Sequence, residues 1–374
     1  MDLQQRINAF VQLGRFLSQF TREDIVQKDD VAHNDLFFDG MLHQIKIAGE
    51  NNGWFTKENV LFALEGWAQT LTQKGLELWL APYEQDLALA QKNNTTTTAN
   101  TATSSKTVAV IMAGNIPLVG FHDFLSVLMS GHRFVGKLSS NDKHLLPFLA
   151  MYLEKVAPSF KGRITFTDDK LLHYDAVIAT GSDNTARYFE YYFGDKPNII
   201  RKNRNSVAVL TGDETETELE ALTEDIFRYY GLGCRNVSKL FVPKGYNFDA
   251  FFNAVYAWRA IIHQNKYANN YDYNKAVYLM SLFELKENGF LMLKEETSYG
   301  SPIATLFYEY YDELTQLSQR LDKDQQYIQC VVTNEETATS LSRKASFVAY
   351  GQTQKPALND YADGVDTIAF LLRI

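Results

Sequence analysis

The sequence contains only two cysteines, Cys234 and Cys330, in 374 residues. Two cysteines so far apart form neither a disulfide framework nor a zinc-ligand pair, and the seven histidines also lack metal-ligand spacing. No apolar run is long enough to span a membrane, and the N-terminus lacks the apolar stretch of a signal peptide. These absences predict a cytoplasmic protein with free thiols, no metal and no integral membrane association.

Positive charge is also scarce, because 36 lysines and arginines face 45 acidic residues, for a net charge of −9. Nucleic acids and anionic membranes attract clustered basic side chains, so neither is expected as a partner. A hydrophobic content of 45% and a charged content of 22% are typical of a globular protein. The length exceeds that of a single hydrophobic core and favours two domains.

Short apolar runs alternate with helix-length segments after residue 107, which predicts a parallel sheet covered by helices on both faces. Ligands of such sheets bind at the carboxyl ends of the strands. A Gly-x-Gly-x-x-Gly fingerprint is missing, so a standard dinucleotide-binding turn is not predicted. Further upstream, residues 57–80 carry one helical pattern. A second series of alternating elements predicts another, smaller α/β domain.

Cys234 lies between Gly-Leu-Gly and Arg235. Glycines open the backbone and a neighbouring cation favours the thiolate, so this segment is either a reactive nucleophile or an ordinary turn. Cys330 lies in an apolar, strand-like run and is expected in the core.

Three polar motifs follow predicted strands. Asn115 in Gly-Asn-Ile-Pro is either a turn residue or an oxyanion donor. Lys137 is either a solvated lysine or a ribose or phosphate contact. In Thr180-Gly181-Ser182, the serine either caps the next helix or helps to bind phosphate at its N-terminus.

The order of these motifs, followed by Cys234 and by Tyr-Gly-Ser-Pro at residues 299–302, resembles the aldehyde dehydrogenase superfamily. The likeness runs from about Thr107 to the C-terminus and is greatest to the acyl-CoA reductase branch, which includes the fatty acid reductase of bacterial bioluminescence. It implies an α/β, aldehyde-dehydrogenase-like fold of two Rossmann-like parallel-sheet domains, with the active site in the cleft between them.

Five segments are expected on this basis. Residues 1–92 would form the N-terminal helical part of the cofactor-binding domain, residues 93–106 a polar loop, and residues 107–211 the core of that domain. Residues 212–345 would form the catalytic domain, and residues 346–374 would return to the core. Relatives place a dimerising hairpin near the polar loop, so a homodimer is left open.

The resemblance also implies roles for individual residues. Cys234 would be the nucleophile, and Asn115 with the Cys234 backbone N–H would form the oxyanion hole. Lys137 would contact the adenosine ribose of the cofactor, and Ser182, next to Thr180 and Gly181, its pyrophosphate.

The acid that would hold the nicotinamide ribose matches Glu296 with a one-residue insertion. Glu295 and Thr297 therefore remain rivals for this role.

Two departures from the family pattern are informative. Aldehyde-oxidising members carry a glutamate that activates water just before the strand at residues 207–210, whereas residues 200–205 here contain no carboxylate. An acyl-enzyme would then lack a hydrolytic base, which favours reduction. Ser140 replaces an acid that often binds the ribose in NAD-preferring relatives, and a neutral residue tolerates the 2′-phosphate of NADPH.

The sequence therefore predicts reduction of an acyl-CoA, of the fatty acyl class, to an aldehyde with NADPH, NADH being possible. Donors other than CoA, namely a carrier protein or an adenylate, stay open. The alternatives are an aldehyde-oxidising dehydrogenase and a catalytically inactive binding scaffold of the same fold.

Overall fold

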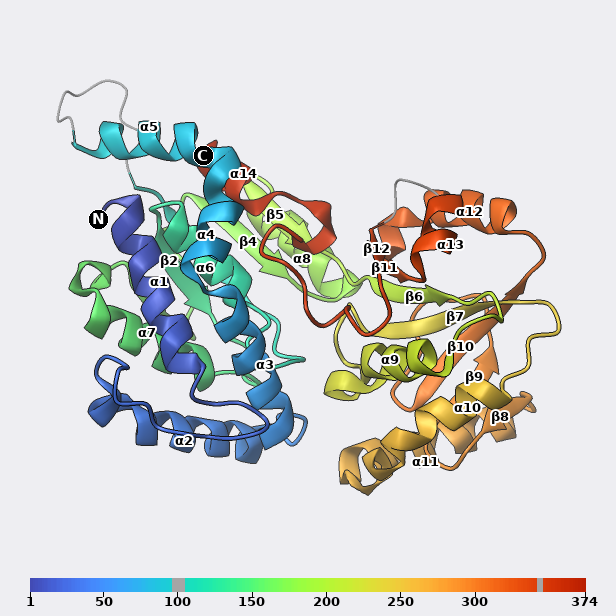
Figure 1. Cartoon of the computed structure of the whole chain (residues 1–374). Helices are drawn as coiled ribbons and strands as arrows, with labels where there is room; N and C mark the ends of the chain where they lie inside the picture. Colours follow the sequence, from blue (N-terminus) through green and yellow to red (C-terminus); the bar gives the residue numbers. More distant parts are fainter. Residues whose placement is uncertain (96–104, 342–345) are drawn as a thin grey trace. The chain divides into compact units, whose positions relative to one another are not determined.

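The computed structural model describes residues 1–95, 105–341 and 346–374. The chain divides into two compact units: residues 1–202 with 357–374, and residues 203–356 (Figure 1). The first unit thus ends nine residues before the end of the expected cofactor-binding core at residue 211. Of the expected polar loop, residues 96–104 lie outside the described part, and residues 93–95 continue helix α5 (Glu84–Thr95).

The first unit is built on a five-stranded parallel sheet in the order β3-β2-β1-β4-β5. Its strands are β1 (Thr107–Ile111), β2 (Arg133–Lys137), β3 (Ile164–Phe166), β4 (Ala176–Thr180) and β5 (Asn198–Arg201). The strand order reverses between β1 and β4, and open α/β sheets bind ligands outside the carboxyl ends of strands at such a point.

Helices cover both faces of this sheet. The helices of this unit are α1 (Leu3–Leu17), α2 (Asn34–Asn51), α3 (Lys57–Thr70), α4 (Gln73–Leu80), α5, α6 (Phe121–Met129), α7 (Leu145–Val156), α8 (Asp183–Phe193) and α14 (Thr367–Leu372), with 3-10 turns at Ala81–Tyr83, Pro158–Phe160 and Ala362–Gly364. Alternation along β1 divides the core. Val108 and Val110 belong to the large cluster formed with α1, α6 and α7, whereas Ala109 packs with Phe189 and Phe193 of α8.

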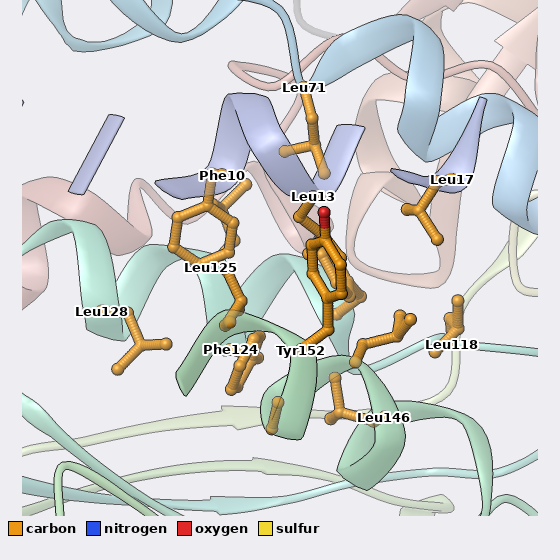
Figure 2. Packing of buried hydrophobic residues seen from close by; sticks show 14 of the residues in the cluster. Phe10, Leu13, Leu17, Leu71, Leu118, Phe124, Leu125, Leu128, Leu146 and Tyr152 are labelled. Atoms are coloured by element: carbon orange, nitrogen blue, oxygen red, sulfur yellow. The ribbon is translucent and has the colours of Figure 1, made fainter. Parts of the chain in front are cut away.

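Figure 2 shows part of the large cluster, in which α1, α6 and α7 interdigitate. Phe10 and Leu13 of α1 are fully buried, and the ring of Tyr152 from α7 stacks on Phe16 with centroids 4.3 Å apart. Leu118, from the loop after β1, reaches into the same cluster. The core therefore anchors a loop that carries one of the candidate site residues.

The prediction of one helix over residues 57–80 is wrong, because α3 ends at Thr70 and α4 begins at Gln73. Leu71 leaves the helical conformation, and the Thr72 side chain accepts a hydrogen bond from the Gly75 N–H as the N-cap of α4. The apolar residues keep a helical spacing across residues 71–72, so the sequence pattern does not show that the helix is interrupted there.

The second unit holds a seven-stranded sheet in the order β12-β11-β6-β7-β10-β9-β8, in which only the β8–β9 pairing is antiparallel among the described strands. The strands are β6 (Asn205–Val209), β7 (Val237–Pro243), β8 (Leu285–Glu287), β9 (Met292–Glu295), β10 (Thr305–Tyr311), β11 (Ile328–Val332) and β12 (Phe347–Val348). Its helices are α9 (Glu216–Phe227), α10 (Asp249–Val255), α11 (Asn265–Met280), α12 (Leu314–Lys323) and α13 (Glu335–Ser340), with 3-10 turns at Arg228–Gly231, Tyr256–His263 and Gln325–Tyr327. The two sheets make the α/β class and the Rossmann-like parallel pairing of the fold plain.

No helix in the described parts of the chain is long and apolar enough to cross a membrane.

Candidate active site

The three strand-end motifs lie on three adjacent strands of the first unit. β1 pairs with both β2 and β4, and Ile111 at its end lies beside Lys137 on one side and Ala179 on the other. Asn115 follows β1 by four residues, and Thr180 ends β4. The structure thus brings these motifs to one edge of the sheet, at the point where the strand order reverses.

The loop that carries Asn115 is fixed although Asn115 itself is exposed. A Cβ atom at Gly114 would lie 2.5 Å from the Cβ and Oγ atoms of Ser139, so only glycine allows the two loops to approach this closely. Leu118 has a φ of 57° and is 2% exposed. Its N–H donates a 2.8 Å hydrogen bond to Oδ2 of Asp142, which locks the loop against the one that follows β2.

Asp142 is itself buried, and its Oδ1 atom has no hydrogen-bond partner in the described structure. Burial raises the pKa of this carboxyl to about 6, which the Leu118 N–H opposes. Asp142 is not among the residues predicted from the sequence. Nothing in its local sequence indicates that it joins two loops.

Lys137 is half-buried at the end of β2, and its Nζ atom donates to the carbonyl oxygen of Asp169 at 3.2 Å. Ser140 is exposed, and its carbonyl oxygen accepts a hydrogen bond from Asn51 Nδ2 at 3.0 Å. No acidic residue occurs between Lys137 and Asp142.

Ser182 caps α8, because its Oγ accepts from the Thr185 N–H at 3.3 Å. The Gly181 N–H donates to the Arg201 carbonyl oxygen at 3.3 Å. A Cβ at Gly181 would come within 2.9 Å of Phe189 and 3.0 Å of Thr185, so glycine allows α8 to pack closely against the backbone after β4. Capping and phosphate binding are compatible, since helix N-termini leave several N–H groups unsatisfied.

These residues fit a nicotinamide dinucleotide. A lysine ammonium and a helix N-terminus with a hydroxyl follow β2 and β4, the two strands that flank β1, and this is the donor chemistry that ribose and pyrophosphate require. At Gly114 and Gly181, neighbouring side chains occupy the space that a Cβ would take, so these glycines fix how closely the strand-end loops pack.

Cys234 lies in the second unit, between a 3-10 turn (Arg228–Gly231) and β7, and is exposed. Three successive residues before it, Tyr229, Tyr230 and Gly231, have positive φ angles of 55°, 60° and 75°. For the two tyrosines this conformation is strained, and such strain persists only where the surroundings hold it.

Asn236 supplies part of that hold. Its Nδ2 donates to the carbonyl oxygens of Asp225 at 3.0 Å and Arg228 at 2.9 Å, and its Oδ1 accepts from the Gly233 N–H at 2.8 Å. Ser206 Oγ donates to the Cys234 carbonyl oxygen at 3.0 Å. The cysteine therefore lies on a backbone fixed from both sides.

The Arg235 side chain is held by the protein, because its Nε donates a hydrogen bond to the Thr353 carbonyl oxygen at 2.6 Å. Asp225 in turn accepts from the N–H and hydroxyl of Thr353 at 3.0 and 2.8 Å. Burial raises the pKa of the Asp225 carboxyl to about 6. This chain of contacts joins α9 to the segment beside Cys234.

Cys330 is fully buried in β11, which confirms the core prediction. Its Sγ lies 3.1 Å from Ser206 Oγ, and burial raises the pKa of its thiol to about 11.

Glu296 and Glu295 differ sharply in their surroundings. Glu295 is exposed, whereas Glu296 Oε2 accepts from Lys294 Nζ at 2.6 Å and Oε1 from the Thr297 N–H at 2.8 Å. The Lys294 ammonium, helped by the Thr297 and Ser298 N–H groups, lowers the pKa of the Glu296 carboxyl to about 2. Glu296 is thus a fixed, ionised acceptor.

Cys234 and Glu296 are connected through β7. Ser238 Oγ donates to the Tyr299 carbonyl oxygen at 2.7 Å, and Lys239 Nζ donates to those of Glu296 and Thr297 at 3.0 and 2.9 Å. Asn236, Ser238 and Lys239 are not among the residues predicted from the sequence, although all three follow Cys234 within five residues. Among the described residues, no group of three or more His, Cys, Asp or Glu side chains could hold a metal ion.

Comparison with known proteins agrees with this architecture. A search of curated proteins gives no match. Among solved structures, P. syringae AldA, an indole-3-acetaldehyde dehydrogenase crystallised with NAD+, is 13% identical with a TM-score of 0.61, covering 94% of this chain and 77% of that one. The delta-pyrroline-5-carboxylate dehydrogenase of Mycobacterium tuberculosis is also 13% identical, with a TM-score of 0.60 and coverage of 100% and 77%.

Aldehyde dehydrogenase 21 of Physcomitrella patens has 9% identity, a TM-score of 0.61 and coverage of 100% and 84%. At these identities the likeness shows the aldehyde dehydrogenase fold. The sequence profile described as acyl-CoA reductase (LuxC) matches residues 56–256, more than half of the chain. The protein therefore belongs to the LuxC acyl-CoA reductase family and is an oxidoreductase that acts on aldehydes or acyl groups.

Proposed function

We propose that this protein reduces a fatty acyl-CoA to the aldehyde with NADPH, through an acyl-enzyme on Cys234. The observation that carries the proposal is the setting of Cys234: an exposed thiol on a strained turn that Asn236 and Ser206 hold in place, in a chain of the acyl-CoA reductase family. An inert structural cysteine would need neither exposure nor such a support.

The Cys234 thiolate attacks the thioester carbonyl carbon and forms a new C–S bond. The tetrahedral oxyanion collapses, the bond to the CoA sulfur breaks, and CoA leaves as its thiolate. A reduced nicotinamide, when bound, supplies the hydride that this acyl group accepts. The C–S bond to Cys234 then breaks, so the aldehyde departs and the thiolate is restored.

Asn115 and the Cys234 N–H are the donors that we assign to the oxyanion. A preorganised donor of this kind lowers a barrier by about 3 kcal/mol. The Gly114–Ser139 approach and the Leu118–Asp142 hydrogen bond support Asn115 in this role, because they fix the backbone on either side of it.

On the cofactor side, Lys137 would bind the adenosine ribose, and Ser182 with Thr180 and Gly181 would face the pyrophosphate. Glu296 would accept hydrogen bonds from the nicotinamide ribose hydroxyls, for which its ionised, fixed carboxylate is suited. Neutral Ser140 leaves room for a 2′-phosphate. The presence of NAD+ in the AldA structure supports a nicotinamide cofactor.

The acyl-enzyme should resist hydrolysis. The segment just before β6, residues 200–204, contains Ile, Arg, Lys, Asn and Arg and no carboxylate that could activate water. Reduction then remains as the productive exit.

The test combines two measurements on wild type, Cys234→Ser and Asn115→Ala. Free CoA is followed after adding long-chain acyl-CoA without cofactor, and NADPH absorbance is followed with both substrates. We expect one burst of CoA per Cys234, an acyl adduct at Cys234 by mass spectrometry, and NADPH loss with aldehyde formation. Asn115→Ala should slow turnover about a hundredfold with little change in KM.

Oxidation of aldehydes without any acyl-CoA reduction would instead identify an aldehyde dehydrogenase. The absence of turnover and of a Cys234 adduct with CoA, carrier-protein and adenylate donors alike would identify a binding scaffold.

A further inference from the structure

We propose that Lys239 is a positioning residue for the cofactor: its buried ammonium fixes the backbone of residues 296–297 from the strand that begins three residues after Cys234. The inference rests on the proposed function, in which Glu296, at the start of the 296–299 loop, binds the nicotinamide ribose. Lys239 itself would touch neither substrate nor cofactor.

The geometry around the ammonium is unusually complete. Lys239 is fully buried, and Nζ donates to the carbonyl oxygens of Glu296 at 3.0 Å and Thr297 at 2.9 Å and to Glu309 Oε2 at 2.6 Å. An ammonium has three N–H donors, so all three are used. Burial lowers the pKa of Lys239, and its contact with Glu309 opposes this shift.

The surrounding groups hold the same loop. Arg320 of α12 pairs with Glu309 and donates to the Thr297 carbonyl oxygen at 3.3 Å. The Tyr299 hydroxyl donates to Asp324 at 2.6 Å, and the Tyr299 ring lies 5.1 Å from Lys239 Nζ. A buried charge is costly without partners, so these contacts lock the loop in one conformation.

Lys239 would act on cofactor binding because it fixes the orientation of Glu296. While Lys239 holds the Glu296 and Thr297 carbonyl oxygens, the Glu296 N–H donates to the Tyr308 carbonyl oxygen. The Glu296 carboxylate accepts from Lys294 and from the Thr297 N–H. Ser238, next to Lys239, holds Tyr299 in the same way. Strand β7, which follows Cys234 in the chain, therefore also fixes the position of Glu296, the residue that we assign to the nicotinamide ribose.

The experiment compares Lys239→Met, Lys239→Arg, Ser238→Ala and the control Thr333→Val. Thr333 donates one buried hydrogen bond to the Val209 carbonyl oxygen in the same sheet, away from residues 296–299. Each variant is measured for its NADPH dissociation constant by fluorescence titration, for the CoA burst without cofactor, and for thermal unfolding.

We expect Lys239→Met to weaken NADPH binding about tenfold or more, while the CoA burst rate changes less than about threefold. Lys239→Arg should restore much of the affinity, and Ser238→Ala should weaken it about threefold. Thr333→Val should lower stability without changing NADPH affinity.

A folded Lys239→Met protein with wild-type NADPH affinity would overturn the inference. If Lys239→Met does not fold, Ser238→Ala decides: unchanged affinity overturns the inference and weaker affinity supports it. A wild-type protein that gives no CoA burst but binds NADPH would sink the proposed reaction while leaving the role of Lys239 open to the same titration.

Discussion

The Asn236 side chain donates from Nδ2 to the carbonyl oxygen of Arg228 at 2.9 Å, across the turn that presents Cys234. That turn includes Tyr229 and Tyr230 in left-handed conformations, each of which costs about 1 kcal/mol or more. The Asn236 side chain thus holds the residue before the strained segment in place, while the Cys234 thiol stays exposed.

Replacing Asn236 by alanine should therefore relax the turn. It removes the hydrogen bonds to Asp225, Arg228 and Gly233, which should lower the free energy of unfolding by about 2 kcal/mol and slow Cys234 acylation by more than about tenfold. Urea denaturation and the CoA burst give the two values. The control is Asn274→Ala, which loses one buried hydrogen bond to Ile303 in the same unit and should leave the burst rate intact. An Asn236→Ala enzyme with a wild-type burst rate would refute the positioning role.

The preference for NADPH over NADH should depend on whether position 140 carries a negative charge. This residue is exposed, and no carboxylate lies between Lys137 and the buried Asp142. Ser140→Glu should raise KM for NADPH about tenfold and lower KM for NADH, because a carboxylate repels the 2′-phosphate and accepts from ribose hydroxyls. Ser140→Gln, which adds similar bulk without charge, should retain the NADPH preference. Equal effects of both substitutions would show that bulk rather than charge sets the preference.

Much of the site could be predicted because it is local. Strand-end motifs are visible where an apolar run meets Asn115, Lys137 or Gly181, and parallel pairing then gathers them at one edge. The neighbours of Cys234 alone left a reactive cysteine and an ordinary turn both open, and only the order of the other motifs favoured the nucleophile.

The contacts that fix these residues could not be predicted in the same way. Lys239 reaches carbonyl groups 57 and 58 residues away, and a buried lysine in a strand reads in the sequence as an exposed one. Likewise, Asp142 meets Leu118 through a backbone N–H, 24 residues away, that leaves no pattern in side-chain composition. Almost every residue carries the same backbone N–H and C=O groups, so the sequence does not show which of them a side chain contacts. These contacts can be identified only in the folded chain.

The choice between Glu296 and Glu295 for the nicotinamide ribose can be decided by matched substitutions. Glu296 is held by Lys294 and the Thr297 N–H, whereas Glu295 is exposed. Glu296→Gln should raise the NADPH dissociation constant about tenfold, because a neutral amide is a weaker acceptor than a carboxylate. Glu295→Gln should change it less than about twofold. The reverse pattern in a fluorescence titration would assign the ribose to Glu295.

Asp142 should make the stability of the protein pH-dependent. Its folded-state pKa of about 6 lies above the usual value of 3.8, since the carboxyl is buried and, within the described part of the chain, accepts a hydrogen bond only from the Leu118 N–H. The folded protein then holds the proton more tightly than the unfolded chain. This contribution favours folding fully below about pH 4 and is lost as the pH rises through 6.

Asp142→Asn removes that proton while keeping an oxygen for the Leu118 N–H. Relative to wild type, the variant should gain roughly 1–3 kcal/mol in unfolding free energy between pH 4 and pH 7, measured by urea denaturation at each pH. The control is Asp168→Asn, at an exposed aspartate, which should show no such trend. A constant difference between wild type and Asp142→Asn across this range would mean that Asp142 stays ionised in the fold. The Leu118 N–H would then stabilise its carboxylate at least as strongly as burial destabilises it.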